Sequence, residues 1–453
     1  MASIAASIAR IKRDALGALT PAVVEQVCAE LGHAWRDREL DPATTVALFV
    51  QQVVHGNVPC SEVRHLAARS FTPSAYCQAR ARLPLAVIQR LLTRVCDAAM
   101  TATRQAGHRW LARHRVFHVD GSTFSMSDTP ALSAAFGLPH GPKGGCGFPT
   151  AHLLVLFHAQ TGLLLNAWAS PLRTGDVAQL AKVHAHLEAG DVLIGDECFS
   201  TYAHLATLVR RGLHGLFPLH RKRVVDFTRR RPHSTACCGR ERIPGTPRSR
   251  WVKSLGWQDQ VVEYFKPQEL PPWMSRQEYD ALPDSIVVRE LRRTVRRPGL
   301  GSVTLTMVTT LVDPTAYPAG ELLELRLRRW DVETNLRHLK VTMNMGVLRC
   351  KTEQGVRKEL AVFCLAYNLV RVVMLEAARR QDVPVARVSF ADALKWVRHA
   401  RPGDVLPELI ANPRRPHRVE PRCKKRRPKQ YALMNKPRDV LRNMLKEGLT
   451  TCH

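Results

Sequence analysis

Apolar residues recur at helical spacing through the first quarter of the chain. Thr20 and Asp41 are each followed by a proline and then by an apolar-periodic run, the pattern of a capped helix with proline in its first turn. Similar runs continue until the pattern changes near residue 110. We therefore expect an all-helical N-terminal segment over residues 1–110, and within it a helix-turn-helix over residues 61–83.

Short apolar runs bounded by turn residues follow this segment. The runs VFHV and VLIG lead directly into Asp120 and Asp196. Two further runs, residues 152–158 and 163–169, are separated by Ala-Gln-Thr-Gly, a sequence typical of a hairpin turn. Helical periodicity lies between some of these predicted strands. Their alternation indicates an α/β fold.

The second half of the chain changes character twice. Strand-like runs between residues 260 and 310 have no helix between them, and helical periodicity then resumes in runs that begin at residue 319. The tail over residues 414–429 is rich in Lys, Arg and Pro, which predicts an extended, solvated segment. We divide the chain into a helical N-terminal DNA-binding domain (1–110), a first part of an α/β core (111–220), a β-rich insertion (221–318), the C-terminal helices of the core (319–400) and a basic C-terminal tail (401–453).

The longest apolar stretch, residues 360–377, contains Asn368 and Arg371. We interpret it as a buried helix rather than a membrane span, and we expect no membrane partner. No signal peptide is recognised at the start of the chain, and the 12 cysteines include no CxxC pair. Free, reduced thiols and a cytoplasmic location are therefore expected.

Charge adds a class of partner to this picture. Lys and Arg total 67 against 39 Asp and Glu, for a formal net charge of +28. Such an excess favours a polyanionic partner, although Arg-rich codon usage gives the same composition. In the predicted helix-turn-helix, Arg80 and Arg82 are candidate DNA contacts, but two positions are about 200° apart on a helix, so they cannot face the same groove. An ordinary helical hairpin with solvated arginines is the alternative.

Two carboxylates that follow predicted strands indicate a metal site. Ligand sites form at the carboxyl ends of strands in open α/β sheets, so Asp120 and Asp196 are expected to meet there. Carboxylate oxygens suit Mg²⁺, and a third carboxylate normally completes a two-metal site. Taken singly, an aspartate at the end of a strand is more often a turn or N-cap residue.

The run RLRRWDVETNLRHLK supplies the third candidate. On one helix Arg326, Glu333 and Lys340 would lie within about 40° of one another, and Arg329 about 60° from Arg326. A carboxylate between long cations suits a metal-bound phosphodiester, although such a glutamate is also common in solvated ion pairs. Trp330 could stack on a displaced base, or could belong to the core.

The blocks VDGST, IGDECF and RLRRWDVETNLRHLK resemble the three catalytic blocks of the DDE transposases of the insertion sequence 4 family. The third block of that family reads Tyr-x2-Arg-x3-Glu-x6-Lys. Arg329, Glu333 and Lys340 match it, whereas Arg326 stands at the tyrosine position. In the second block Glu197 stands where a cation is usual. The resemblance implies an RNase H-like catalytic core with a β-rich insertion, preceded by the all-helical N-terminal domain.

The resemblance also implies an activity, that of a DNA transposase that binds element ends, cleaves them by metal-dependent hydrolysis and transfers the strand to target DNA. Two Mg²⁺ ions are expected as cofactors, with Mn²⁺ as a substitute, and double-stranded DNA and a second copy of the chain as partners. The implied catalytic and metal-binding residues are Asp120, Asp196 and Glu333, and the implied DNA-binding residues are Arg326, Arg329 and Lys340. The residue pattern alone adds Trp330, Arg80 and Arg82 as candidate DNA-binding residues.

Two alternatives stay open from the sequence. The residues at positions 326 and 197 motivate a catalytically impaired or domesticated DNA-binding relic of a transposase. A different metal-dependent nuclease or hydrolase on a related core, acting on RNA or another polyanion, would share the charge and the carboxylates.

Overall fold

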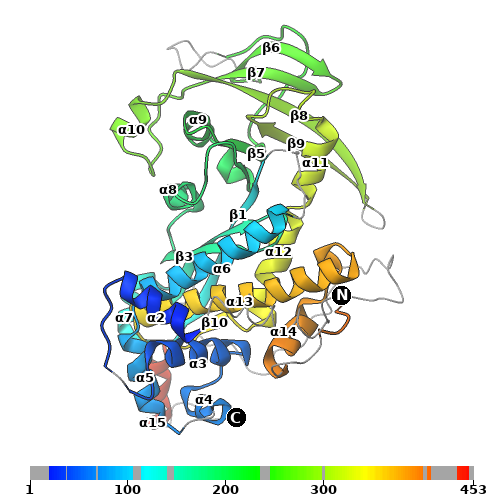
Figure 1. Cartoon of the computed structure of the whole chain (residues 1–453). Helices are drawn as coiled ribbons and strands as arrows, with labels where there is room; N and C mark the ends of the chain where they lie inside the picture. The colour runs from blue at the N-terminus through cyan, green and yellow to red at the C-terminus, as the bar shows by residue number, and fades with distance from the viewer. Residues whose placement is uncertain are drawn as a thin grey trace.

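The computed structural model describes residues 20–36, 38–67, 70–105, 114–139, 147–234, 245–297, 301–400, 406–409 and 436–447. Figure 1 shows helices gathered at one end of the molecule and the strands β6 to β9 at the other, with β1 and its neighbours between them. The basic segment 414–429 lies outside the described residues.

The described part of the N-terminal segment, residues 20–105, contains only helices. Their starts follow the sequence signals: the side chains of Thr20, Asp41 and Thr72 cap three of them by accepting from backbone N–H groups three residues on. The helices are α2 (Pro21–Glu30), α3 (Pro42–Val54), α4 (Cys60–Leu66), α5 (Pro73–Arg82) and α6 (Leu85–Gln105).

Half of the central sheet has the strand order β3-β2-β1-β4-β5. The hairpin partners β2 and β3 are antiparallel to their neighbours, whereas β1, β4 and β5 are parallel. This mixed α/β arrangement fits the expected RNase H-like core. The strands are β1 (Val116–Met126), β2 (Thr150–His158), β3 (Leu164–Pro171), β4 (Val192–Ile194) and β5 (His214–Pro218).

The predicted insertion continues this sheet. β9 pairs antiparallel with β5, and β8, β7 and β6 follow in order, giving a sheet of ten strands. The sequence pattern missed β6 and the short helix α10. The elements are β6 (Ser249–Gly256), β7 (Asp259–Phe265), α10 (Arg276–Asp280), β8 (Ser285–Arg297) and β9 (Gly301–Thr309).

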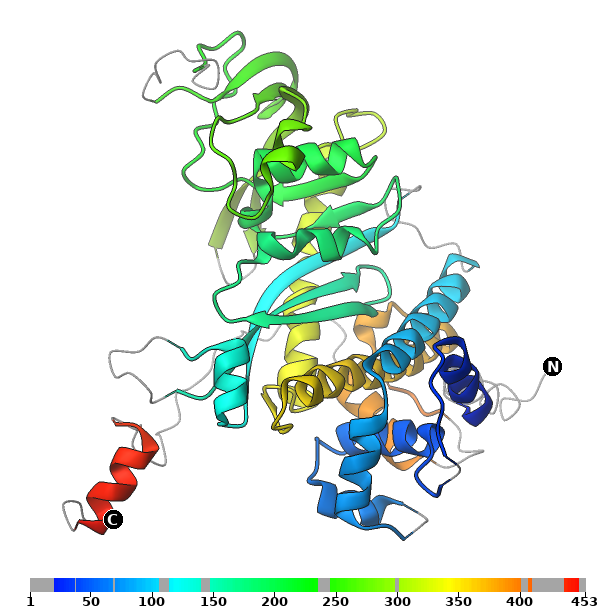
Figure 2. The same ribbon diagram turned by 90° about the vertical axis from the view of Figure 1, so that its left-hand side faces the viewer.

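Shorter helices cover the sheet between these strands. Between β3 and β4 the predicted helical periodicity forms a 3-10 turn followed by a short α-helix. In Figure 2 the helix α7 lies beside the end of the long strand β1. These elements are α7 (Pro130–Phe136), the 3-10 turn η2 (Asp176–Gln179), α8 (Leu180–His184), the 3-10 turn η3 (Glu197–Ser200) and α9 (Tyr202–Arg210).

The single helix expected over residues 319–340 is instead broken twice. Turn residues 328–329 separate its first two parts, and a π-helical turn follows, a feature that often occurs at functional sites. A two-residue strand, β10 (Val347–Leu348), then pairs with β1. The elements are α11 (Ala319–Leu327), α12 (Trp330–Arg337), the π-turn η5 (His338–Thr342), α13 (Glu353–Gln381), the 3-10 turn η6 (Val385–Arg387), α14 (Phe390–His399) and α15 (Arg438–Lys446).

The long apolar helix α13 runs through the interior. It is the one helix of the described residues long and apolar enough to cross a membrane, and 83% of its most apolar window is buried inside the protein. Its buried side chains share one hydrophobic cluster with residues of α2, α3, α6 and β2. The N-terminal helices are therefore packed onto the core through α13 and α6, which run beside each other in Figure 1.

Candidate active site

The register of two parallel strands brings Asp120 and Asp196 to the same level. In β1 and β4, His118 is the partner of Ile194, and each aspartate lies two residues further on. Alternate residues of a strand share a face, so Asp120 lies on the face of β1 that carries His118. The sequence analysis was wrong to end the first strand at Asp120, because the strand continues to Met126 by pairing with β2 and β10.

Asp196 lies just beyond the end of β4 and caps the 3-10 turn η3. Its Oδ1 accepts a hydrogen bond of 2.8 Å from the backbone N–H of Cys198. Phe199 packs so closely over Gly195 that a Cβ atom at position 195 would lie 2.5 Å from its ring, so glycine is required before Asp196. Glu197 begins the same turn and is partly exposed.

Glu333 reaches the same region through Arg329. The Arg329 guanidinium lies 3.3 Å from Oδ1 of Asp120 and 3.6 Å from Oε1 of Glu333. One guanidinium thus joins two carboxylates that are more than 200 positions apart in the chain. Arg329 is a turn residue at the N-terminus of α12, and this break between α11 and α12 sets its position over β1.

Lys340 of the third block lies on the same side of β1 as Arg329. The ammonium group of Lys340 donates a hydrogen bond of 3.0 Å to Oγ of Ser122, two residues after Asp120 and on the same strand face. Burial lowers the pKa of Lys340. Lys340 belongs to the π-turn η5, so the π-turn determines which residue faces the strand at this point.

Arg326 is half-buried and lies close enough to all three carboxylates to feel their charge. Burial and the charge of Arg329 lower its pKa to about 10, while Asp196, Asp120 and Glu333 act in the opposite direction. Its Nε is buried and finds no hydrogen-bond acceptor among the described residues. A buried donor of this kind is unusual in proteins and is suited to an acceptor supplied by a ligand.

A cavity of about 250 Å³ adjoins these arginines. Strand β9 forms one wall, and the end of α11 and the start of α12 form the other. The indole of Trp330 is 40% exposed here, so it is not a core residue. The lining residues are Val303, Leu305, Arg326, Leu327, Arg329 and Trp330.

A further carboxylate, that of Asp176, lies in the same cluster and was not predicted from the sequence. It lies against Gly121, where a Cβ atom would come within 2.3 Å of Oδ1 of Asp176, so only glycine fits after Asp120. Asp176, Asp196 and Cys198 offer ligand atoms within 4.8 Å of one another. Glycine in the block VDGST was a signal for close approach, but nothing in the sequence identified the approaching residue.

His152 and Gln179 hold Asp176 in place. Nε2 of His152 lies 2.6 Å from Oδ1 of Asp176, and its Nδ1 lies 3.0 Å from Nε2 of Gln179. Because Oε1 of Gln179 accepts from the Ser170 hydroxyl, its amide nitrogen donates to the imidazole. The ring proton of His152 is therefore on Nε2, facing the carboxylate.

The electrostatics of this cluster favour a bound cation. Burial, with the neighbouring Asp196 and Asp176, raises the pKa of Asp120 to about 6, against the opposing effect of Arg329. Burial and the same carboxylates raise the pKa of Cys198, which therefore remains a thiol and a poor ligand. The donors present are hard carboxylate oxygens, so the residues fit Mg²⁺ or Mn²⁺ better than a thiophilic metal.

The two arginines of the predicted helix-turn-helix lie apart, as their spacing required. Arg82 is exposed at the end of α5. Arg80, the other predicted DNA contact, is half-buried, and its guanidinium stacks 3.8 Å from the ring centre of Phe49. Its donors also bind Gln52, Cys60 and Cys350 within the protein.

Carboxylates gathered beside the parallel strands β1 and β4, with arginine and lysine side chains next to them, are typical of enzymes that act on phosphodiesters with the help of divalent metals. The sequence profile of the family described as "Transposase DDE domain" matches residues 111–369, more than half of the chain. The chain belongs to this family of DDE transposases.

Comparison with individual proteins agrees with this family. The chain is 25% identical over 441 residues to the transposase InsG for insertion sequence element IS4 of Escherichia coli (strain K12), covering 91% of this chain and 92% of that protein. The predicted resemblance to the insertion sequence 4 family is thereby confirmed. Among solved structures, the piggyBac transposase synaptic complex with hairpin DNA matches 85% of this chain and 78% of its own, at 8% identity and a TM-score of 0.41. A likeness this distant adds nothing to the assignment.

Proposed function

We propose that this transposase cleaves the ends of its own DNA element by metal-dependent hydrolysis and then joins the freed end to target DNA. Asp120, Asp196 and Glu333 are the proposed metal ligands. The observation that carries the proposal is the position of Arg329 between Asp120 and Glu333, because it supports convergence of the third block on the two strand aspartates.

Each residue has a defined role in this reaction. Two divalent ions, when bound, would activate the attacking oxygen and stabilise the leaving oxygen. The unused donor of Arg326 and the side chains of Arg329 and Lys340 are suited to the phosphate oxygens on either side of the cut. Trp330, at the mouth of the 250 Å³ cavity, is suited to stack on a base displaced from the duplex.

The bond changes are those of two successive phosphoryl transfers. In the first, water attacks a phosphodiester at the element end, the P–O3′ bond breaks, and the products are a 3′-hydroxyl and a 5′-phosphate. In the second, this 3′-hydroxyl attacks a target phosphodiester and a target 3′-hydroxyl leaves. Pairing of two ends requires two active sites, so we propose that a homodimer assembles on double-stranded DNA.

The test is cleavage of duplexes that carry the DNA flanking the gene, in Mg²⁺ and in Mn²⁺. Wild-type protein should nick at the element boundary, whereas Glu333→Gln should bind the same duplex and leave it uncut. Asp382→Asn, on the far end of α13, is the control and should cut normally. Tight binding by the wild type without nicking in either metal would favour the relic.

A further inference from the structure

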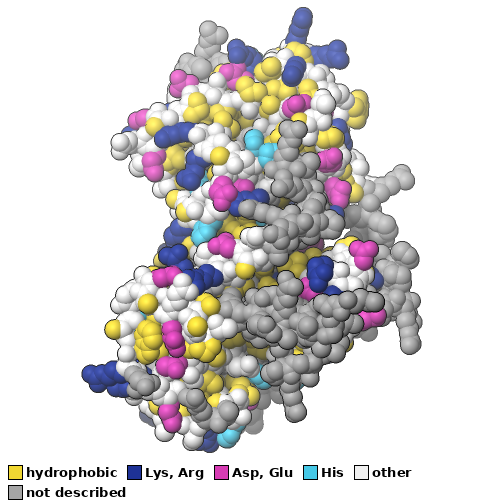
Figure 3. Space-filling model, in the orientation of Figure 1, with side chains coloured by type: hydrophobic (Ala, Val, Ile, Leu, Met, Phe, Trp, Pro, Cys, Tyr) yellow, Lys and Arg dark blue, Asp and Glu magenta, His cyan; other side chains and the backbone are white. Residues whose placement is uncertain are grey.

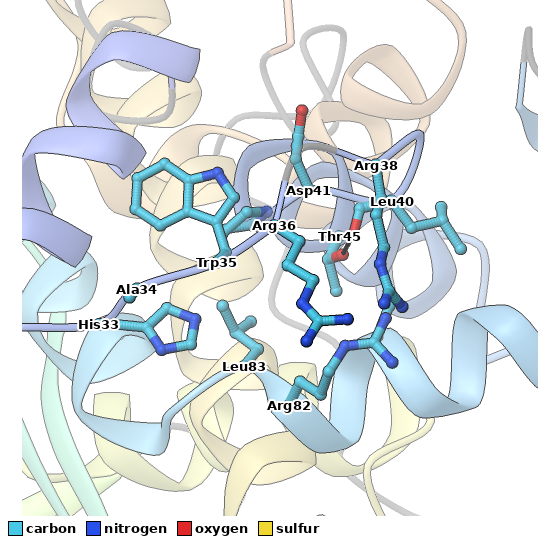
Figure 4. A pocket seen from close by; sticks show the side chains of 12 residues that line it. His33, Ala34, Trp35, Arg36, Arg38, Leu40, Asp41, Thr45, Arg82 and Leu83 are labelled. Carbon is cyan, nitrogen blue, oxygen red and sulfur yellow. Dashed lines mark hydrogen bonds between the residues drawn. The ribbon is translucent and has the colours of Figure 1, made fainter.

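A second group of cations lies away from the catalytic carboxylates, in the N-terminal helical region. Figure 4 shows a hollow between the α2–α3 connection and the C-terminal end of α5, with a volume of about 310 Å³. The connection contributes His33, Trp35, Arg36 and Arg38, and α5 ends in Arg82. None of these residues belongs to the blocks that identify the family.

Three guanidinium groups converge in this hollow. Arg36, Arg38 and Arg82 are all exposed, and Figure 4 shows their side chains directed toward one another. Across the described ranges, no hydrogen bond or ion pair holds any of the three. Like charges at close range repel, so this arrangement favours a bound anion.

The carboxylate that lines the hollow does not neutralise this charge. Asp41 caps α3, and its Oδ1 accepts a hydrogen bond of 2.6 Å from the backbone N–H of Thr44. In Figure 4 its side chain is directed away from the three guanidinium groups. Arginine forks match phosphate oxygens in geometry as well as in charge, which makes a phosphate diester a fitting ligand.

An aromatic surface borders the same hollow. Trp35 is 39% exposed and stacks on His33, with ring centres 6.3 Å apart and planes at 26°. A nucleotide in a DNA strand has a phosphate group and a flat base. The guanidinium groups suit the phosphate, and the indole of Trp35 suits the sugar or the base.

The hollow is fixed relative to the catalytic region. Lys358 of α13 donates hydrogen bonds to the backbone oxygens of Arg80 and Ala81, directly before Arg82. The same helix packs against β3 and β10 of the core sheet. A DNA phosphate held at Arg82 would therefore lie at a set distance from Asp120.

We propose that this hollow binds one phosphodiester of element-end DNA away from the scissile bond, and so fixes the position of the cut. The inference rests on the proposed function, since it assumes that element-end DNA is the substrate. It adds a second binding site, whose ligand is a backbone phosphate and whose role is to set the register of cleavage.

The experiment uses the full-length protein and duplexes of the DNA flanking the gene, each with one neutral methylphosphonate linkage at a different position. One linkage outside the cut should weaken wild-type binding about tenfold, as expected for the loss of one phosphate contact. Arg82→Ala and Arg36→Ala should bind the unmodified duplex about tenfold more weakly, with a salt slope smaller by about 1. The methylphosphonate at that position should not weaken the binding of these variants any further. Their cuts should spread over neighbouring positions.

Arg276→Ala removes the same charge from exposed α10 and serves as the matched control, with wild-type affinity and a single cut position. The inference is overturned if Arg82→Ala and Arg36→Ala keep the wild-type affinity and salt slope and are weakened by the same methylphosphonate linkages as the wild type. If the wild type still cuts this DNA with Mg²⁺, the proposed function stands, and only phosphate binding in the hollow is refuted. A wild type that neither binds nor cuts this DNA would refute both.

Discussion

Among single residues, Asp120, one of the proposed metal ligands, is held in its charged form at a cost to stability. The ordinary pKa of an aspartate is 3.8, and burial raises the pKa of Asp120 to about 6. Below 3.8 the carboxyl is protonated in both folded and unfolded chains. As pH rises from 3.8 to about 6, the unfolded chain loses this proton first, so stability falls through this window and the loss is complete above it.

We therefore expect Asp120→Asn to be more stable than the wild type at pH 7.5 in EDTA, by about 1–3 kcal/mol. This difference in the free energy of unfolding should decrease as the pH is lowered from 6 to 4. Mg²⁺ should also decrease it, because the ion stabilises only the wild type by binding to it. Urea denaturation measures this directly. The exposed Asp128→Asn is the control and should change little; an Asp120→Asn protein less stable than the wild type at pH 7.5 would refute the linkage between burial and stability.

Asp176 is expected to act as a positioning residue for Asp120 and Asp196. Asp176→Asn and Gly121→Ala should each raise the Mg²⁺ concentration needed for half-maximal cleavage, because each displaces a group that packs beside the metal ligands. Asp176→Asn should also weaken Mn²⁺ binding to the uncomplexed protein, as measured by titration calorimetry. Unchanged Mn²⁺ affinity, together with an unchanged Mg²⁺ requirement, would reduce Asp176 to a structural role.

At this scale the sequence predicted residue types better than their contacts. The apolar runs before Asp120 and Asp196 and the helical spacing around Glu333 pointed to residues that the structure places near one another, with Arg326 and Arg329 beside them. Asp176 was missed because its approach to Gly121 depends on how η2 folds over the sheet. The stacking of Arg80 on Phe49 could not be predicted, because a cation near the end of a helix gives no sign in the sequence of the ring it contacts.

At the scale of elements, α13 joins the N-terminal helices to the core through a buried carboxylate. Glu359 is 1% exposed and accepts hydrogen bonds from the side chain of Asn57 and from the backbone N–H groups of Arg349 and Cys350. Sequence periodicity predicted α13 well, because a long apolar run at helical spacing is compatible with few structures other than a buried helix. It failed at residues 319–340, where the chain turns at residues 328–329 and α12 packs against β1.

Glu359→Gln should destabilise the protein by about 2–4 kcal/mol, because an amide NH₂ group would face backbone donors that now bind a carboxylate. Glu353→Gln, in the exposed first turn of the same helix, loses a surface ion pair with Arg357 and should cost under about 1 kcal/mol. Equal midpoints of chemical unfolding for the two variants would contradict this account of Glu359.

At the scale of the whole molecule, the N-terminal helices and the core share a hydrophobic cluster, and the insertion extends the core sheet. Composition predicted a polyanionic partner but not this continuity. Figure 3 shows Lys and Arg side chains on both ends of the molecule, consistent with a long DNA substrate that contacts more than the catalytic face.

A fragment that begins at residue 111 should therefore fail to fold by itself, because it exposes the face of α13 that packs against α6 and α3. We expect aggregation, or a circular dichroism melt without a cooperative transition. A soluble fragment with a cooperative melt would show that residues 1–110 are an independent domain.

We propose that Asp120, Asp196 and Glu333 share bound divalent ions. Iron-mediated cleavage of the polypeptide is the most direct test of this metal site. With Fe²⁺ in place of Mg²⁺, and with ascorbate and peroxide, the backbone should be cut near positions 120, 196 and 333, and excess Mg²⁺ should suppress all three cuts together. Cuts confined to the region of residues 176–198, with none near 333, would contradict the claim and would place the metal with Asp176 and Asp196 instead.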